Sequence, residues 1–119
     1  MEHLALPVSD QETSRRFHET YFGFDAQPPR HHDDDVLNPY NDAGFSLALG
    51  PASEPIRLPP FLHFGIHLPA PEAVRAFRDR LAAGGVSIVE EWDEPEYVSV
   101  ECLDPDAYVV EAAWEPHHR

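Results

Sequence analysis

The sequence predicts an α+β fold of two βαβββ modules whose strands together form a cup-shaped mixed sheet. The main observation is a repeat, because the order strand, helix, strands occurs twice, about sixty residues apart. One module alone would leave one face of its small sheet uncovered, and a second copy is the simplest cover. We therefore expect a single domain over 1–119, with module one at 1–50, a proline-rich linker at 51–60 and module two at 61–116.

Module one opens with a strand over 3–8, in which apolar residues alternate with His3, Ala5 and Pro7. Ser9 then precedes a helix, and Glu12 three residues later completes a Ser-x-x-Glu capping box. We expect this helix to reach about Tyr21 and end at Gly23, to bury Phe17 and Tyr21, and to expose His18.

The rest of module one is less regular. Residues 24–44 are expected to hold one or two short strands and an exposed loop, and the run His31–Asp35 within them is interpreted as a solvated charge cluster. A strand is predicted over 45–49, ended by Gly50-Pro51.

Module two repeats the order with clearer signals. A strand is predicted over 61–68, and Pro71 suits the first position of a helix whose apolar stripe is Val74, Phe77 and Leu81. Gly84-Gly85 ends this helix, and three strands are predicted at 86–90, 97–102 and 108–114.

Charge and composition exclude several functions. A net charge of -14 would repel phosphate backbones and anionic lipids, so we expect neither nucleic acid nor a membrane as a partner. The chain has no lysine, which excludes Schiff-base chemistry. No apolar run approaches the roughly 18 residues of a membrane span. The single Cys102 is expected to be a buried apolar residue, and a chain without disulfides fits the cytoplasm.

The strand faces point to a site. One face of the predicted strands is apolar and suits the helices, whereas the other combines small residues with histidines and carboxylates, as the lining of a polar cavity should. His3 and His63 lie on the first strand of each module, and Glu111 lies on the last strand. Two imidazoles and one carboxylate suit Fe(II), Mn(II), Ni(II) or Zn(II) and leave positions open for substrate oxygens.

These residues resemble the vicinal-oxygen-chelate superfamily of glyoxalases, bleomycin-resistance proteins and extradiol dioxygenases. The resemblance covers nearly the whole chain and is carried by His3-Leu-Ala-Leu-Pro-Val-Ser-Asp, Leu62-His-Phe-Gly-Ile66 and Leu103-Asp-Pro-Asp-Ala-Tyr-Val-Val-Glu111. It implies that His3, His63 and Glu111 are metal ligands.

Departures from the family narrow the chemistry. The fourth ligand of glyoxalase I, a glutamate ending the first module, is matched here to Leu47, which favours a three-ligand site. The absence of lysine disfavours the phosphonate substrates of fosfomycin-resistance transferases. The glycine of the usual Asp-Pro-Asp-Gly turn is Ala107, which we expect to strain that turn.

The leading hypothesis is a metal-dependent enzyme acting on a small organic substrate by isomerase, lyase or dioxygenase chemistry. Candidate catalytic residues are Glu101 as a general base, His67 as a proton shuttle and Tyr97 in the cavity wall. The alternative is a metal-free binder of bleomycin-resistance type, to which an acidic surface would attract a cationic drug. A homodimer is expected, since the stiff linker allows modules to be exchanged and sites to be shared between chains.

Overall fold

The computed structural model describes residues 3–25, 36–42 and 44–116. The chain divides into two compact units, unit one over Met1–Arg57 and unit two over Leu58–Arg119. Each unit has its own sheet and its own helix, as the α+β prediction requires.

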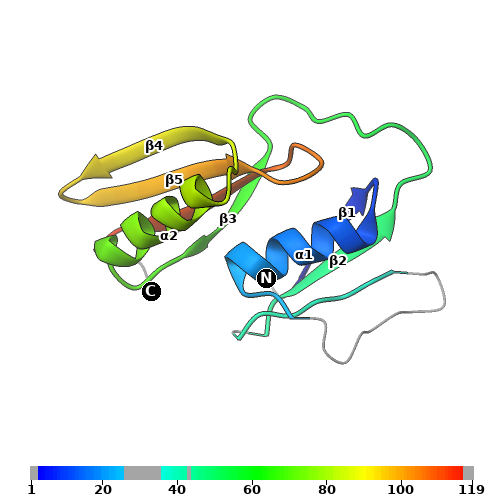
Figure 1. Cartoon of the computed structure of the whole chain (residues 1–119), viewed down its shortest axis with the longest axis horizontal. Helices are drawn as coiled ribbons and strands as arrows, with labels where there is room; N and C mark the ends of the chain where they lie inside the picture. Colours follow the sequence, from blue (N-terminus) through cyan, green and yellow to red (C-terminus); the bar gives the residue numbers. More distant parts are fainter. Residues whose placement is uncertain (1–2, 26–35, 43, 117–119) are drawn as a thin grey trace. The chain divides into compact units, whose positions relative to one another are not determined.

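Unit one contains a parallel pair of strands and one helix (Figure 1). β1 (His3–Val8) confirms the first predicted strand, and it pairs in parallel with β2 (Ser46–Pro51). β2 thus starts one residue later and ends two residues later than the strand predicted over 45–49, because its pairing with β1 continues through Gly50 and Pro51.

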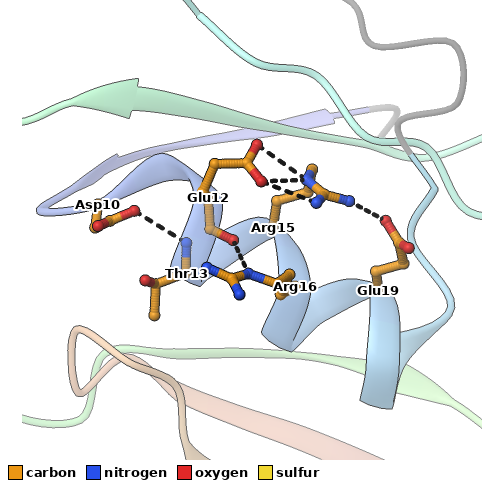
Figure 2. Close-up of polar contacts among 6 residues, drawn as sticks. All are labelled: Asp10, Glu12, Thr13, Arg15, Arg16 and Glu19. Atoms are coloured by element: carbon orange, nitrogen blue, oxygen red, sulfur yellow. Dashed lines mark hydrogen bonds and ion pairs between the residues drawn. The ribbon is translucent and has the colours of Figure 1, made fainter.

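α1 (Gln11–Phe22) begins one residue later than the predicted capping box requires. Asp10, not Ser9, is the N-cap, since its Oδ1 accepts a hydrogen bond from the Thr13 amide at 3.0 Å (Figure 2). That hydrogen bond also lowers the pKa of the Asp10 carboxyl. Glu12 pairs with Arg15 at 2.9 Å, and with Asp10 as the N-cap the predicted box that starts at Ser9 does not describe the start of this helix.

The buried face of α1 differs from the prediction by one position. Ser14, His18 and Phe22 are buried, whereas Phe17 and Tyr21 are only half-buried. The expectation of an exposed His18 was therefore wrong, because its ring is fully buried and lies edge-on to Phe24, with 6.2 Å between the ring centroids. The helix ends at Gly23, whose φ of 72° lies in the left-handed region as expected for a C-terminal glycine.

A third extended segment lies along β2 in unit one. Leu37 and Tyr40 form isolated antiparallel bridges with Leu49 and Ser46, and Tyr40 also bridges Asp25. The short strands predicted within 24–44 appear here as single bridges. The His31–Asp35 run lies outside the described residues.

Unit two has the predicted βαβββ order. It comprises β3 (His63–His67), α2 (Pro71–Ala83), β4 (Ile88–Glu94), β5 (Tyr97–Leu103) and β6 (Val109–Trp114). The strands form one sheet in the order β3-β6-β5-β4, in which β3 is parallel to β6 and the other pairs are antiparallel (Figure 1).

α2 covers one face of this sheet, and its predicted features are confirmed. Pro71 is in the first turn, and Val74, Phe77 and Leu81 are buried. They contribute to a core with the inward residues of β5 and β6, which are Val98, Val100, Cys102, Val110 and Ala112. Burial raises the pKa of the Cys102 thiol to about 12, as expected for a packing residue.

Two strand boundaries in unit two differ from the prediction. β4 runs from Ile88 to Glu94, not over 86–90, because its acidic end pairs with the helix: Asp93 binds Arg75 at 2.8 Å and Glu91 binds Arg78 at 3.1 Å. β3 begins at His63, because Phe61 has a φ of 69° and breaks the extended conformation.

Candidate functional site

The face of the unit two sheet that lies opposite α2, the open face, carries polar side chains from all four strands. Glu101 on β5 pairs with Glu111 on β6, and Glu111 in turn pairs with Gly65 on β3. On the other side, Glu90 of β4 pairs with Glu101. His63 is two residues before Gly65 and therefore lies on the same face of the sheet.

Gly65 permits β3 to pass close to Glu111. A Cβ at position 65 would lie 2.5 Å from the Glu111 carbonyl oxygen and 2.9 Å from the Glu111 Cβ. Both contacts are shorter than side chains tolerate, so only glycine fits at this register. The small residue predicted for the cavity face thus has a structural reason.

Glu111 is half-buried and hydrogen-bonded. The Tyr97 hydroxyl donates to Glu111 Oε2 at 3.1 Å, and partial burial raises the pKa of the Tyr97 phenol. This hydrogen bond fixes one carboxylate oxygen and leaves the other available. Tyr97 therefore orients the carboxylate that the sequence analysis singled out.

Glu101 holds its proton more strongly than an ordinary carboxyl. Partial burial, together with the neighbouring carboxylates of Glu90 and Glu111, raises its pKa to about 7. The pKa of Glu90 is lowered instead, chiefly because it receives a hydrogen bond from Glu101. His63 also interacts electrostatically with Glu90 and Glu101, so His63 and the three glutamates belong to one cluster.

The two histidines of β3 have different surroundings. His63 Nδ1 lies 2.9 Å from the backbone oxygen of Phe61. His67 Nε2 lies 3.9 Å from Glu115 Oε1, near the end of β6. His63 thus lies nearer to the carboxylate cluster, and His67 lies toward the edge of the same face.

The strand register of unit one reproduces that of unit two. His3 pairs with Ser46 as His63 pairs with Val109, so the pairing of Ala5 with Ala48 corresponds to that of Gly65 with Glu111. The counterpart of Glu111 is therefore Ala48, and the match to Leu47 was wrong. Leu47 is fully buried and pairs with Leu4, on the opposite face.

Asn38 is the counterpart of Glu101. The antiparallel bridges on either side place it across from Ala48, as Glu101 lies across from Glu111. Its side chain is 6% exposed, its Oδ1 accepts from Ser46 Oγ at 3.4 Å, and its Nδ2 makes no hydrogen bond. Asn38 was not predicted from the sequence, because its partners across the sheet are known only from the strand register.

An open hollow of about 820 Å³ lies over this face of unit one. Its lining is small and largely uncharged, and consists of His3, Ala5, Leu6, Pro7, Val36, Asn38, Tyr40, Gly44, Ser46, Ala48, Gly50 and Pro51. Among the lining residues that the structure describes, His3 is the one ionisable side chain apart from Tyr40. The hollow has the size and character of a small-molecule site.

The structure thus assembles part of the predicted site. His63, Glu111, Glu101 and Tyr97 share the open face of unit two, whereas His3 belongs to unit one. Across residues 3–25, 36–42 and 44–116, no three histidine, cysteine or acidic side chains form a group ready to hold a metal ion. Neither described helix is long and apolar enough to span a membrane.

Solved structures of similar fold come from several bacteria. A fosfomycin resistance protein, FosX, from Listeria monocytogenes is 18% identical, with a TM-score of 0.80 over 98% of this chain and 93% of that one. A possible glyoxalase from Bacillus cereus is 23% identical, with a TM-score of 0.78 over 94% and 96%. A glyoxalase/dioxygenase from Nostoc punctiforme is 20% identical, with a TM-score of 0.75 over 98% and 90%.

These likenesses confirm the predicted fold class. Comparison with curated proteins gives no significant match. The family model named Glyoxalase/Bleomycin resistance protein/Dioxygenase superfamily matches residues 1–112. On that match, and in agreement with the repeated register of its strands, the chain belongs to the glyoxalase/bleomycin resistance protein/dioxygenase superfamily.

Proposed function

We propose that this chain is a divalent-metal-dependent enzyme that acts on a small organic substrate through two adjacent oxygens. The observation that carries the proposal is the open face of unit two, where a histidine, a hydrogen-bonded carboxylate and a carboxyl of raised pKa lie on neighbouring strands. A sheet face that is merely solvated has no need of this clustering.

The donors fit a borderline divalent metal. His63 offers an imidazole nitrogen, and Glu111 offers the carboxylate oxygen that Tyr97 does not bind. We propose His3 as the third ligand, contributed by the same chain or by a second copy. A FosX variant from Listeria monocytogenes was crystallised with Mn(II) and a dihydroxypropylphosphonic acid, which supports metal use in this fold. When bound, the metal would act as a Lewis acid toward the substrate oxygens.

Side chains of the protein itself would accept and return the substrate proton. The Glu101 carboxyl lies beside the Glu111 position, and either of its oxygens can accept or return a substrate proton. Tyr97 keeps Glu111 oriented, and His67 at the edge of the face can pass a proton to solvent. This assignment keeps isomerase, lyase and dioxygenase chemistry open.

The hollow of unit one bears on the substrate class. Its lining would hold a small molecule that is neutral or weakly polar, since no carboxylate or guanidinium belongs to the part of the wall that the structure describes. Asn38 supplies an amide donor in the wall for a substrate oxygen.

Metal analysis of protein purified without added metal tests the proposal. We expect metal to be lost when His3, His63 and Glu111 are replaced together by alanine, and retained in a control carrying His67→Ala and Glu115→Ala. The control removes a histidine of the same strand and a nearby acid. Equal metal content in the unchanged chain and the triple variant would overturn the assignment.

A mixing experiment tests whether chains share sites. A His3→Ala chain is unfolded and refolded together with a Glu111→Ala chain. If His3 serves the site of a second copy, about a quarter of the sites in a randomly mixed dimer regain all three ligands. Metal binding that stays at the level of the separate variants would place each site within one chain.

A further inference from the structure

Phe61 has an unusual backbone conformation just before β3. Its φ of 69° lies in the left-handed region, which is a genuine outlier for a bulky side chain. Its side chain is 91% exposed, so burial of the ring does not compensate for the strain. Strain of this kind persists where the surrounding structure requires the conformation, and it occurs often beside functional groups.

Two parts of Phe61 lie against His63. The Phe61 carbonyl oxygen lies 2.9 Å from His63 Nδ1, and the two rings meet edge to face with 5.0 Å between their centroids. Because a carbonyl oxygen can only accept, Nδ1 must carry the hydrogen. In the neutral ring the lone pair is then on Nε2, and this nitrogen alone can bind a metal.

We propose that Phe61 is a positioning residue for the metal ligand His63. Its left-handed φ lets the chain close the turn from Pro59 to Leu62, and this turn holds the peptide group whose carbonyl accepts from Nδ1 and selects the Nδ1–H tautomer, while the Phe61 ring restrains the imidazole. The inference rests on the proposed function in one respect, namely that His63 binds the metal. A hydrogen bond to the second nitrogen of a ligating histidine fixes the tautomer and the ring orientation and strengthens the ligand.

The sequence around Phe61 suits this role. Pro59 and Pro60 precede it, and the Leu62 amide donates to the Pro59 oxygen at 3.4 Å, which closes a tight turn. The turn delivers Phe61 directly to the start of β3, where pairing of His63 with Val109 fixes the backbone on the other side. The carbonyl of Phe61 is thereby held between two restrained segments.

Two substitutions separate the carbonyl from the ring. Phe61→Pro forces φ to about -65°, which the left-handed position of the turn does not admit, so the turn opens and the peptide group that carries the carbonyl is no longer held beside Nδ1. Phe61→Gly adopts the left-handed conformation without strain and keeps the carbonyl, but it removes the ring. Leu62→Ala is the matched control, since Leu62 is the next residue and is also exposed.

The first measurement is the tautomer of His63 in the metal-free full chain, from long-range ¹H–¹⁵N spectra of the imidazole. We expect the Nδ1–H form in the unchanged chain, in Phe61→Gly and in Leu62→Ala, and a shift toward the Nε2–H form in Phe61→Pro. The signals of His67 serve as an internal reference. An Nε2–H form in the unchanged chain, or an unchanged tautomer in Phe61→Pro, would overturn the proposal.

The second measurement is the affinity for Zn²⁺, by competition with a chelating dye. We expect it to fall roughly 10- to 100-fold in Phe61→Pro and less in Phe61→Gly, which remains informative if the proline variant does not fold. His63→Ala is measured alongside. If His63→Ala weakens Zn²⁺ binding and both Phe61 variants bind like the unchanged chain, the positioning role is wrong. If His63→Ala has no effect either, the proposed metal function itself is wrong.

Discussion

The hydroxyl of Tyr97 donates a hydrogen bond to Oε2 of Glu111 at 3.1 Å, across two neighbouring strands. Tyr97→Phe removes this bond and keeps the ring, so the fold should be retained while the carboxylate loses its fixed orientation. We expect the affinity for Zn²⁺ to fall about 10-fold, in the range typical of groups that orient a metal ligand. Calorimetric titration measures it, and unaltered affinity would show that Tyr97 does not orient Glu111.

Gly65→Ala tests the close approach of β3 to β6. The new Cβ would meet the Glu111 backbone oxygen at 2.5 Å, so β3 must move away from β6. We expect a loss of about 1–3 kcal/mol in the free energy of unfolding, together with weaker metal binding. Gly50→Ala is the matched control, because the nearest atom to its Cβ, the Leu6 oxygen, is 4.0 Å away. Urea titration should separate the two variants, and equal stability would contradict the tight packing.

Ala107→Gly should stabilise the protein. Ala107 has a φ of 67° in the turn where Asp104 Oδ1 accepts from the amides of Asp106 and Tyr108. Glycine removes the cost of the left-handed conformation but raises the conformational entropy of the unfolded chain. We expect a net increase of about 0.5–1 kcal/mol in the free energy of unfolding. The strain predicted for this turn is thus confirmed in its geometry, and denaturant unfolding measures its cost. Ala83→Gly, at the end of α2, should instead lower stability.

Glu101 makes the stability of the metal-free protein depend on pH. Below pH 4.5 the carboxyl is protonated in both the folded and the unfolded state, so it does not make the free energy of unfolding vary with pH. As the pH rises from 4.5 to about 7, the unfolded chain loses this proton while the folded protein keeps it, so the free energy of unfolding falls. Glu101→Gln should remove this part of the decline. Melting temperatures at pH 5 and pH 8 after EDTA treatment measure it, with Glu115→Gln as control, and an identical decline in both variants would contradict it.

Much of the fold follows from local signals in the sequence. The buried face of α2 was predicted from the apolar stripe of Val74, Phe77 and Leu81, and the ends of the helix were predicted from Pro71 and the paired glycines. In β4 the local signal failed. The strand was predicted to end at Glu90, yet Glu91 and Asp93 remain in it because Arg78 and Arg75 of α2 pair with their carboxylates.

Site residues could be predicted where the residue type itself suggests metal binding. They could not be predicted where only the strand register shows that a residue belongs to the site. His63 and Glu111 stand out as a histidine and a carboxylate in strands whose residues alternate between an apolar and a polar face. Ala48 and Asn38 carry no such signal, and only strand pairing identifies them as counterparts of Glu111 and Glu101. The burial of His18 was missed because a shift of one residue turns a helix face by about 100°.

Under the proposed function, the different residues at the two equivalent positions set the number of metal ions that each chain would bind. Glu111 occupies its position in unit two, and Ala48 leaves the corresponding position of unit one without a donor. With the proposed ligands each chain supplies one complete set, so the stoichiometry is one ion per chain whether or not units are exchanged. Under the proposed function, a duplicated fold thus carries one metal centre, and the sheet face of unit one, which lacks the carboxylate, is left to contact the substrate.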